Sequence, residues 1–195
     1  MVMDRSFRHF LGDESGISLT EGLISLPIVM LAFAAFVEFG YAMFQWNQTV
    51  KALQYGARLA AVSDPVATSF DPNAIAADGV GGTAIPAGAS FVCGPALAGC
   101  NTTALNRIVE GAGGRPGMRD LNWRIAPENV VVTYELSGLG YYGRPMGAIA
   151  TIRLEVRNID FDLPILGGLL GLDNITVPAH PVTITTEDLK TCSTC

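Results

Sequence analysis

Histidine and lysine are scarce in this chain of 195 residues, which contains only His9, His180, Lys51 and Lys190 of these two types. A histidine-based metal site or a Ser-His-Asp triad therefore has almost nothing to use. The formal net charge is −6, and no basic patch is present. This charge argues against nucleic acid as a partner, because phosphate binding needs clustered cations. We expect no enzymatic activity, no metal site and no cofactor.

Charge of either sign is also sparse, at 15% of residues, whereas 49% are hydrophobic. This balance is more apolar than that of an ordinary soluble domain. Residues 17–36 form a run of 20 mostly apolar residues, enough for a helix to cross about 30 Å of hydrocarbon. Arg5 and Arg8 favour a cytoplasmic N-terminus, and Tyr41 and Trp46 would lie at the far interface.

A secretory signal peptide is the obvious competing interpretation of this end of the chain. Ala32-Phe33-Ala34 fits its cleavage pattern, but the apolar run continues past it to Val37. Asp13 and Glu14 also place acids directly before the run. An uncleaved signal anchor is a further alternative for this segment.

One carboxylate, Glu21, interrupts the start of the apolar run. An acid inside a membrane helix costs roughly 2.5–3.5 kcal/mol at the bilayer centre and less near the edge, so it indicates a function and needs a partner. A cut after Gly16 would create an amino group on Ile17, one helical turn from Glu21. A neighbouring copy could present the same group.

The order of these features resembles a type IV prepilin: a charged leader ending in Gly16, a hydrophobic run, and Glu21 at the fifth position after the cut. Three further features restrict the resemblance to one group of pilins: Pro27 at the eleventh position, Glu38-Phe39-Gly40, and the small-residue segment 52–61. Together they resemble the TadE-like minor pilins (pseudopilins) of the Flp/Tad pilus system. The resemblance covers residues 13–62, with a weaker similarity over 148–188. The sequence differs from the family pattern at Gly22, where the family usually has Phe.

The resemblance implies three regions: a cytoplasmic leader at 1–16, a transmembrane and assembly helix at 17–64, and a periplasmic α+β domain at 65–195. It implies that a prepilin peptidase cuts after Gly16 and that Glu21, Pro27 and Glu38 serve assembly or processing. The implied partners are other minor and major Flp pilins and the assembly platform of the bacterial inner membrane. A membrane-anchored periplasmic binding domain or enzyme is the alternative.

Two residues of the run have predictable local effects. Pro27 should kink the helix or soften one turn because it lacks a backbone donor, and Ser25 is a candidate to satisfy the freed group. Glu38 lies near the exit from the membrane, so we expect its carboxylate to reach water.

The helix should continue beyond the membrane until Ser63-Asp64-Pro65 ends it. An apolar face recurs at helical spacing over Trp46, Val50, Leu53, Ala57 and Ala61. A stripe of small residues also runs along it, at Ala52, Gly56 and Ala60. Such a stripe allows close helix packing, either on the protein's own sheet or on another pilin helix.

The rest of the chain predicts a small domain with an antiparallel sheet packed on the helix, as in pilins. Residues 65–100 read as irregular loop, and Asn101 should cap a helix over about 103–110. Alternation predicts strands over 130–136 and 148–156, and an edge strand over 174–186 interrupted by Pro178 and Pro181. The apolar connection 164–172 is either core or a contact surface.

The four cysteines form two close pairs beyond the apolar run, which suits an oxidising compartment such as the periplasm. Three connectivities are possible, and we favour Cys93–Cys100 with Cys192–Cys195. A reduced or metal-binding tail at Cys192 and Cys195 is the alternative.

Overall fold

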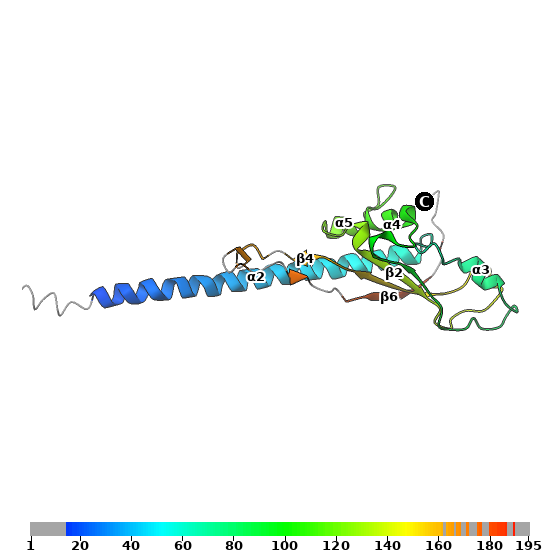
Figure 1. Ribbon diagram of the computed structural model, residues 1–195, viewed down its shortest axis with the longest axis horizontal. Helices are drawn as coiled ribbons and strands as arrows, with labels where there is room; N and C mark the ends of the chain where they lie inside the picture. The colour runs from blue at the N-terminus through cyan, green and yellow to red at the C-terminus, as the bar shows by residue number, and fades with distance from the viewer. Residues whose placement is uncertain are drawn as a thin grey trace, which may run out of the picture. The chain divides into compact units, whose positions relative to one another are not determined.

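One long helix dominates the N-terminal part of the chain in this computed structural model, which describes residues 15–161, 163–165, 167–168, 171, 175–176, 180–186 and 189. Helix α2 spans Ser15–Ala61, 47 residues, and Figure 1 shows it as one continuous coil. The predicted helix is confirmed. It ends at Ala61, just before Ser63-Asp64-Pro65, as the proline predicts.

The chain divides into two compact units. The first comprises Met1–Ala42 and Leu163–Asp173, and the second comprises Met43–Asp162 and Asn174–Cys195. Within the described residues, the first unit consists of the N-terminal part of α2 and the apolar connection. The second unit is the small α+β domain, and it includes the C-terminal part of α2.

The domain contains a four-stranded antiparallel sheet in the order β1-β2-β3-β6. Its strands are β1 (Ser90–Cys93), β2 (Val130–Glu135), β3 (Thr151–Val156) and β6 (Val182–Thr185). Val132 pairs with Cys93 on one side and with Leu154 on the other. A separate ladder joins β4 (Asp160–Phe161) to β5 (Ile175–Thr176). The predicted α+β class is confirmed.

The alternating patterns located β2 and β3 correctly, and β6 is an edge strand that follows Pro181, as expected. Pro178 lies outside the described residues. The prediction of irregular loop over 65–100 is wrong, because this stretch contains α3 (Pro72–Ala77), β1 and the 3-10 turn η1 (Pro95–Leu97). Strand β1 is only four residues long and is held by pairing with β2, a contact that local sequence does not reveal.

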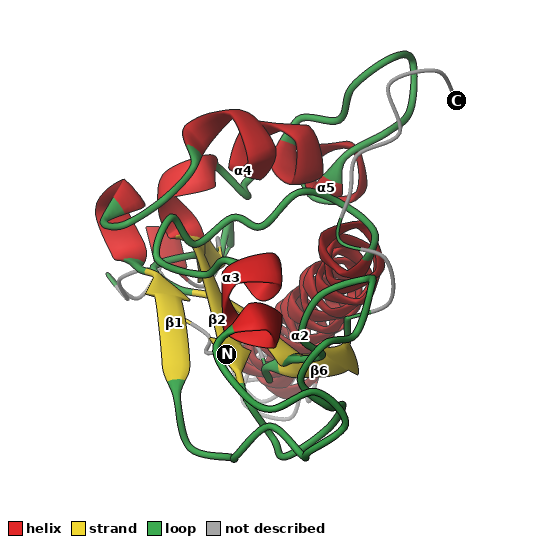
Figure 2. Ribbon diagram, turned by 90° about the vertical axis from the view of Figure 1, so that its right-hand side faces the viewer, coloured by secondary structure: helices red, strands yellow, loops and turns green. Residues whose placement is uncertain are grey.

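Side-chain caps begin two of the short helices. Asn101 accepts a hydrogen bond from the backbone N–H of Ala104 and starts α4 (Thr102–Val109), which confirms the predicted helix. Asp71 caps α3 in the same way through the N–H groups of Asn73 and Ala74. Sequence reasoning missed the single turn α5 (Met118–Leu121) and the 3-10 turn η2 (Pro127–Asn129). Figure 2 shows α4 and α5 grouped on one side of the domain.

The core of the domain forms between the C-terminal part of α2 and the sheet. Leu53 and Ala57 of α2 are buried together with Ile152 and Leu154 of β3 and Tyr134 of β2. Burying a large apolar side chain contributes about 1.5–3 kcal/mol, so this cluster stabilises the packing of α2 on the sheet.

The small-residue stripe of α2 lies in this core. Ala52 and Ala60 are fully buried, and Gly56 is buried between them. A Cβ atom added to Gly56 would lie 3.0 Å from Cδ2 of Leu154 and would overlap the side chain of Met118. The stripe was expected to pack either on the protein's own sheet or on another pilin helix. In the structure it packs on the protein's own domain.

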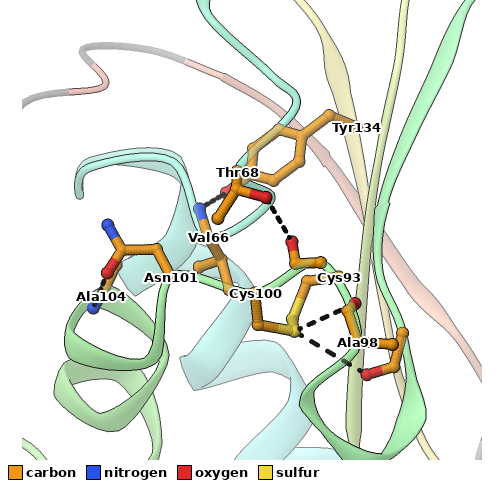
Figure 3. Close-up of a disulfide and its surroundings, with 10 residues drawn as sticks. Val66, Thr68, Cys93, Ala98, Cys100, Asn101, Ala104 and Tyr134 are labelled. Atoms are coloured by element: carbon orange, nitrogen blue, oxygen red, sulfur yellow. Dashed lines mark hydrogen bonds between the residues drawn. A yellow bond between two sulfur atoms is a disulfide. The ribbon is translucent and has the colours of Figure 1, made fainter.

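A disulfide joins Cys93 at the end of β1 to Cys100 in the loop before α4, with 4.6 Å between their Cα atoms (Figure 3). This predicted bond is confirmed, whereas Cys192 and Cys195 lie outside the described residues. The same region ties down the chain that leaves α2. The N–H of Asn101 donates to the Val66 carbonyl at 2.7 Å, and the N–H of Val66 donates to the Tyr134 hydroxyl oxygen at 3.0 Å.

Tyr134 is fully buried beneath this loop, and its ring stacks on Phe70 with 4.6 Å between ring centroids. Burial raises the pKa of Tyr134 to about 12, although the hydrogen bond from Val66 acts in the opposite direction. The phenol is therefore neutral at ordinary pH, and it anchors the end of α2 to the sheet.

Candidate membrane and assembly segment

The N-terminal part of α2 exposes apolar side chains on all its sides. Ile28, Val29, Met30 and Leu31 follow one another in sequence, and each is at least 43% exposed. Successive helical residues point about 100° apart, so the turn from Ile28 to Leu31 is exposed on every side. By length and composition alone, the helix from Leu19 to Ala61 could cross a membrane. Exposed apolar surface on this scale indicates a covering partner, either lipid or protein.

Glu21 lies exposed near the beginning of this apolar surface. The backbone is helical from Ser15, so Gly16, Ile17 and Glu21 lie on one continuous helix. Ile17 and Glu21 are four residues apart, about 6 Å along the axis and on the same side. This spacing is compatible with the predicted pairing of a new Ile17 ammonium with Glu21, and the pairing stays a prediction.

Pro27 lies inside α2, which continues through this turn as one helix. A proline at this position deprives the carbonyl of Leu23 of its helical donor. The Ser25 hydroxyl donates to the Gly22 carbonyl at 3.3 Å instead. The expectation that Ser25 satisfies the freed group is therefore wrong, because its hydroxyl bonds to the carbonyl one residue earlier.

Glu38 is buried, with only 2% of its surface exposed, so the expectation that its carboxylate reaches water is wrong. The backbone N–H of Ile165 donates a hydrogen bond to its Oε1 atom. A carboxylate that leaves water needs such donors, and a backbone N–H on an apolar surface needs an acceptor. The two groups lie 127 residues apart in sequence, which is why the sequence pattern did not pair them.

The connection that contributes Ile165 is not core in its described residues. Pro164 and Ile165 are exposed, and Leu163 is half-buried. This excludes the core alternative for these residues and favours a contact surface. The described parts of the first unit thus present apolar residues from both α2 and the connection.

Three buried polar residues form a hydrogen-bonded group where α2 joins the domain. Sequence analysis did not identify this group. Gln45, Thr49 and Asn122 are each at most 4% exposed. The Thr49 hydroxyl donates to the Gln45 carbonyl at 2.9 Å, and Nδ2 of Asn122 donates to Oγ1 of Thr49 at 2.9 Å. The Gln45 side-chain amide has no hydrogen-bond partner among the described residues. The spacing of Gln45 and Thr49 on one helix face was the available signal.

Within the described ranges, no group of three or more histidine, cysteine or acidic side chains is placed to hold a metal ion. The arrangement that stands out is instead the long helix, with apolar residues on all sides in one part and a single covered face in the other.

Residues 16–58 match the family model described as TadE-like protein. The matched segment lies within α2 and contains Gly16, Glu21, Pro27, Glu38 and Gly56. The suspected family relationship is confirmed for this segment, which is less than a quarter of the chain. Searches of curated proteins and of solved structures found no match. The family match thus covers part of α2 and none of the strands of the α+β domain.

Proposed function

We propose that this chain is a membrane-anchored minor pilin, or pseudopilin, that supports assembly of a Tad-type pilus. One observation supports this most strongly: the TadE-like match lies on a helix whose N-terminal part exposes apolar residues on every side. A helix of this kind must be covered by lipid or by other apolar helices. A pilin uses both environments in turn, first the bilayer and then the assembled pilus complex.

The proposed topology places the N-terminus in the cytoplasm and the α+β domain in the periplasm of a bacterial inner membrane. Arg5 and Arg8 precede the span, in agreement with the preference of basic residues for the cytoplasmic side. The Cys93–Cys100 disulfide lies on the opposite side of the span, and disulfides persist in oxidising compartments.

The proposed processing step is hydrolysis of the peptide bond between Gly16 and Ile17 by a prepilin peptidase. The cut releases residues 1–16 and leaves an ammonium on Ile17 within reach of Glu21 on the same helix or on a neighbour. Attraction between opposite charges strengthens as water is excluded, so this pair would align two helices inside the bilayer. The proposed partners are the peptidase, other minor and major Flp pilins, and the membrane assembly platform.

The processing claim can be tested by intact mass measurement of the protein recovered from membranes of a piliated strain. We expect a mass that lacks residues 1–16. Gly16→Val is the matched variant, because a branched side chain at the cut should block the peptidase and preserve the full mass. A wild-type product that retains residues 1–16 while pili form would reject processing and favour an uncleaved membrane anchor.

A further inference from the structure

Trp123 is a highly exposed aromatic side chain of the α+β domain, with 71% of its surface exposed. It directly follows Asn122, which is 3% exposed and bonds to Thr49 of α2 at 2.9 Å. The guanidinium carbon of Arg124 lies 4.8 Å from the centroid of the Trp123 ring. Nη1 of Arg124 in turn donates to the Asp160 carbonyl at 3.0 Å. A large apolar ring thus lies at the surface between two residues that are hydrogen-bonded to other parts of the domain.

The position of Trp123 within the domain is defined by the bond from Asn122 to Thr49. Thr49 belongs to the first turns of α2 in this unit, which begins at Met43. Met43 and Phe44 are 47% and 55% exposed, and Phe44 lies about 8 Å before Thr49 along the helix axis. Figure 1 shows α5, which precedes Trp123, and α3 at opposite ends of the domain. Exposed apolar residues from α2 and from the segment after α5 therefore share the end at which α2 enters the domain.

We propose that Trp123 and Arg124 form a contact with the phospholipid headgroup layer. The inference rests on the proposed function, since a membrane-spanning α2 would bring this end of the domain close to a bilayer. Tryptophan is enriched at the membrane–water interface because its ring is apolar and its N–H can bond to water or headgroups. A guanidinium beside it is attracted to lipid phosphate.

The contact depends on tethering by α2 and not on charge at long range. The whole chain carries a net charge of −6, which opposes attraction to an anionic surface. A tether raises the effective concentration of the domain at the bilayer, so a small contact is sufficient. Its effect is to limit how the domain can tilt on the membrane.

The experiment uses the full chain reconstituted in phosphatidylcholine–phosphatidylglycerol vesicles. The chain contains two tryptophans, Trp46 and Trp123, so each single substitution leaves one reporter. Trp46→Phe reports on Trp123, and Trp123→Phe reports on the helix. Emission is measured with nitroxide lipids labelled near the headgroup or near the bilayer centre, and with iodide on both sides of the membrane.

We expect headgroup-labelled lipid to quench Trp123 at least about twofold more than centre-labelled lipid, with little quenching by iodide. If lipid labels quench Trp46 while iodide alone quenches Trp123, the membrane span stands and the headgroup contact is rejected. If Trp123 is protected from both quenchers and the protection falls on dilution, a second copy covers it and the proposal is also rejected. A protein that fails to float with the vesicles would contradict the proposed function itself.

Discussion

The two parts of α2 differ in what covers them, although they belong to one helix. Between Leu19 and Phe39, large apolar side chains are exposed in every direction. Between Gln45 and Ala61, one face is buried by the sheet and the short helices. The domain buries the apolar face of the second part, whereas the apolar side chains of the first part need lipid or other proteins to cover them. Changes in the first part should therefore affect assembly, and changes in the second part should affect folding.

The two acids of α2 illustrate the same difference. Glu21 is exposed on the uncovered part, whereas Glu38 is covered and bonds to the backbone of Ile165. A covered and hydrogen-bonded carboxylate has a partner within its own chain. The exposed acid on an apolar helix does not gain this protection, which makes it the better candidate for contact with another protein.

The largest effect on pilus assembly should come from Glu21→Ala. The substitution removes the charge that we propose to pair with the Ile17 ammonium, while it leaves the domain untouched. We expect insertion and cleavage to continue, and recovery of other pilins with the variant to fall at least about tenfold, as loss of about 1.4 kcal/mol in association would produce. The measurement is co-purification from membranes, together with the mass of the processed chain.

Glu21→Asp provides the matched control, because it retains the charge with a shorter reach. Its recovery of partner pilins should fall between that of the wild type and that of Glu21→Ala. Normal piliation and normal complex recovery with Glu21→Ala would show that this carboxylate has no role in assembly.

Gly56→Leu and Gly40→Leu compare the same substitution on the covered and uncovered parts. A side chain at Gly56 would overlap Met118 and approach Leu154, whereas a Cβ at Gly40 has no atom within 4 Å. Overpacking a core typically costs about 1–3 kcal/mol, so we expect Gly56→Leu to lower the free energy of unfolding by about 3 kcal/mol. Gly40→Leu should leave it unchanged. Urea unfolding of the detergent-solubilised chain measures both, and equal losses would contradict the division of α2.

Removal of the Cys93–Cys100 bond should have the next largest effect on the free energy of unfolding. The closed loop spans a sequence separation of seven residues, for which loop entropy predicts about 2–3 kcal/mol of stabilisation. The double variant Cys93→Ser/Cys100→Ser should unfold at lower urea concentration by that amount and should still insert in the membrane. Non-reducing peptide mapping of the wild type is the companion test, and a free thiol at Cys93 would contradict the assigned bond.

Sequence patterns predicted the elements that carry a local signal. The long apolar run indicated α2, alternation indicated β2 and β3, and Asn101 indicated the start of α4. Strand β1 and the turn α5 were missed because each is four residues long and is fixed by distant partners. Short elements of this kind depend on tertiary contacts more than on their own propensity.

The candidate assembly segment was predictable only in part, for the same reason. Glu21 and Pro27 were identified from their positions in the apolar run. The burial of Glu38 depends on Ile165, and that of Asn122 on Thr49, pairs that lie far apart in sequence. Neither pairing produces a periodic pattern in the sequence, so these contacts can be recognised only in the three-dimensional structure.

Tyr134→Phe should give the smallest effect on stability. The effect should depend on pH, because Tyr134 is buried beneath the loop that follows the covered part of α2. The pKa of Tyr134 is raised from 10.0 to about 12, so the folded protein retains a proton that the unfolded chain loses between these values. The resulting stability is complete below pH 10 and decreases as pH rises towards 12. Between pH 9 and pH 11 the wild type should lose about 1 kcal/mol through this group, and Tyr134→Phe should not. Both proteins are unfolded in urea at each pH, and the difference between their pH-dependent losses isolates Tyr134 from other groups. Equal losses would show that the phenol is not held in a buried, neutral state in the folded protein, and would contradict its burial beneath the loop that follows α2.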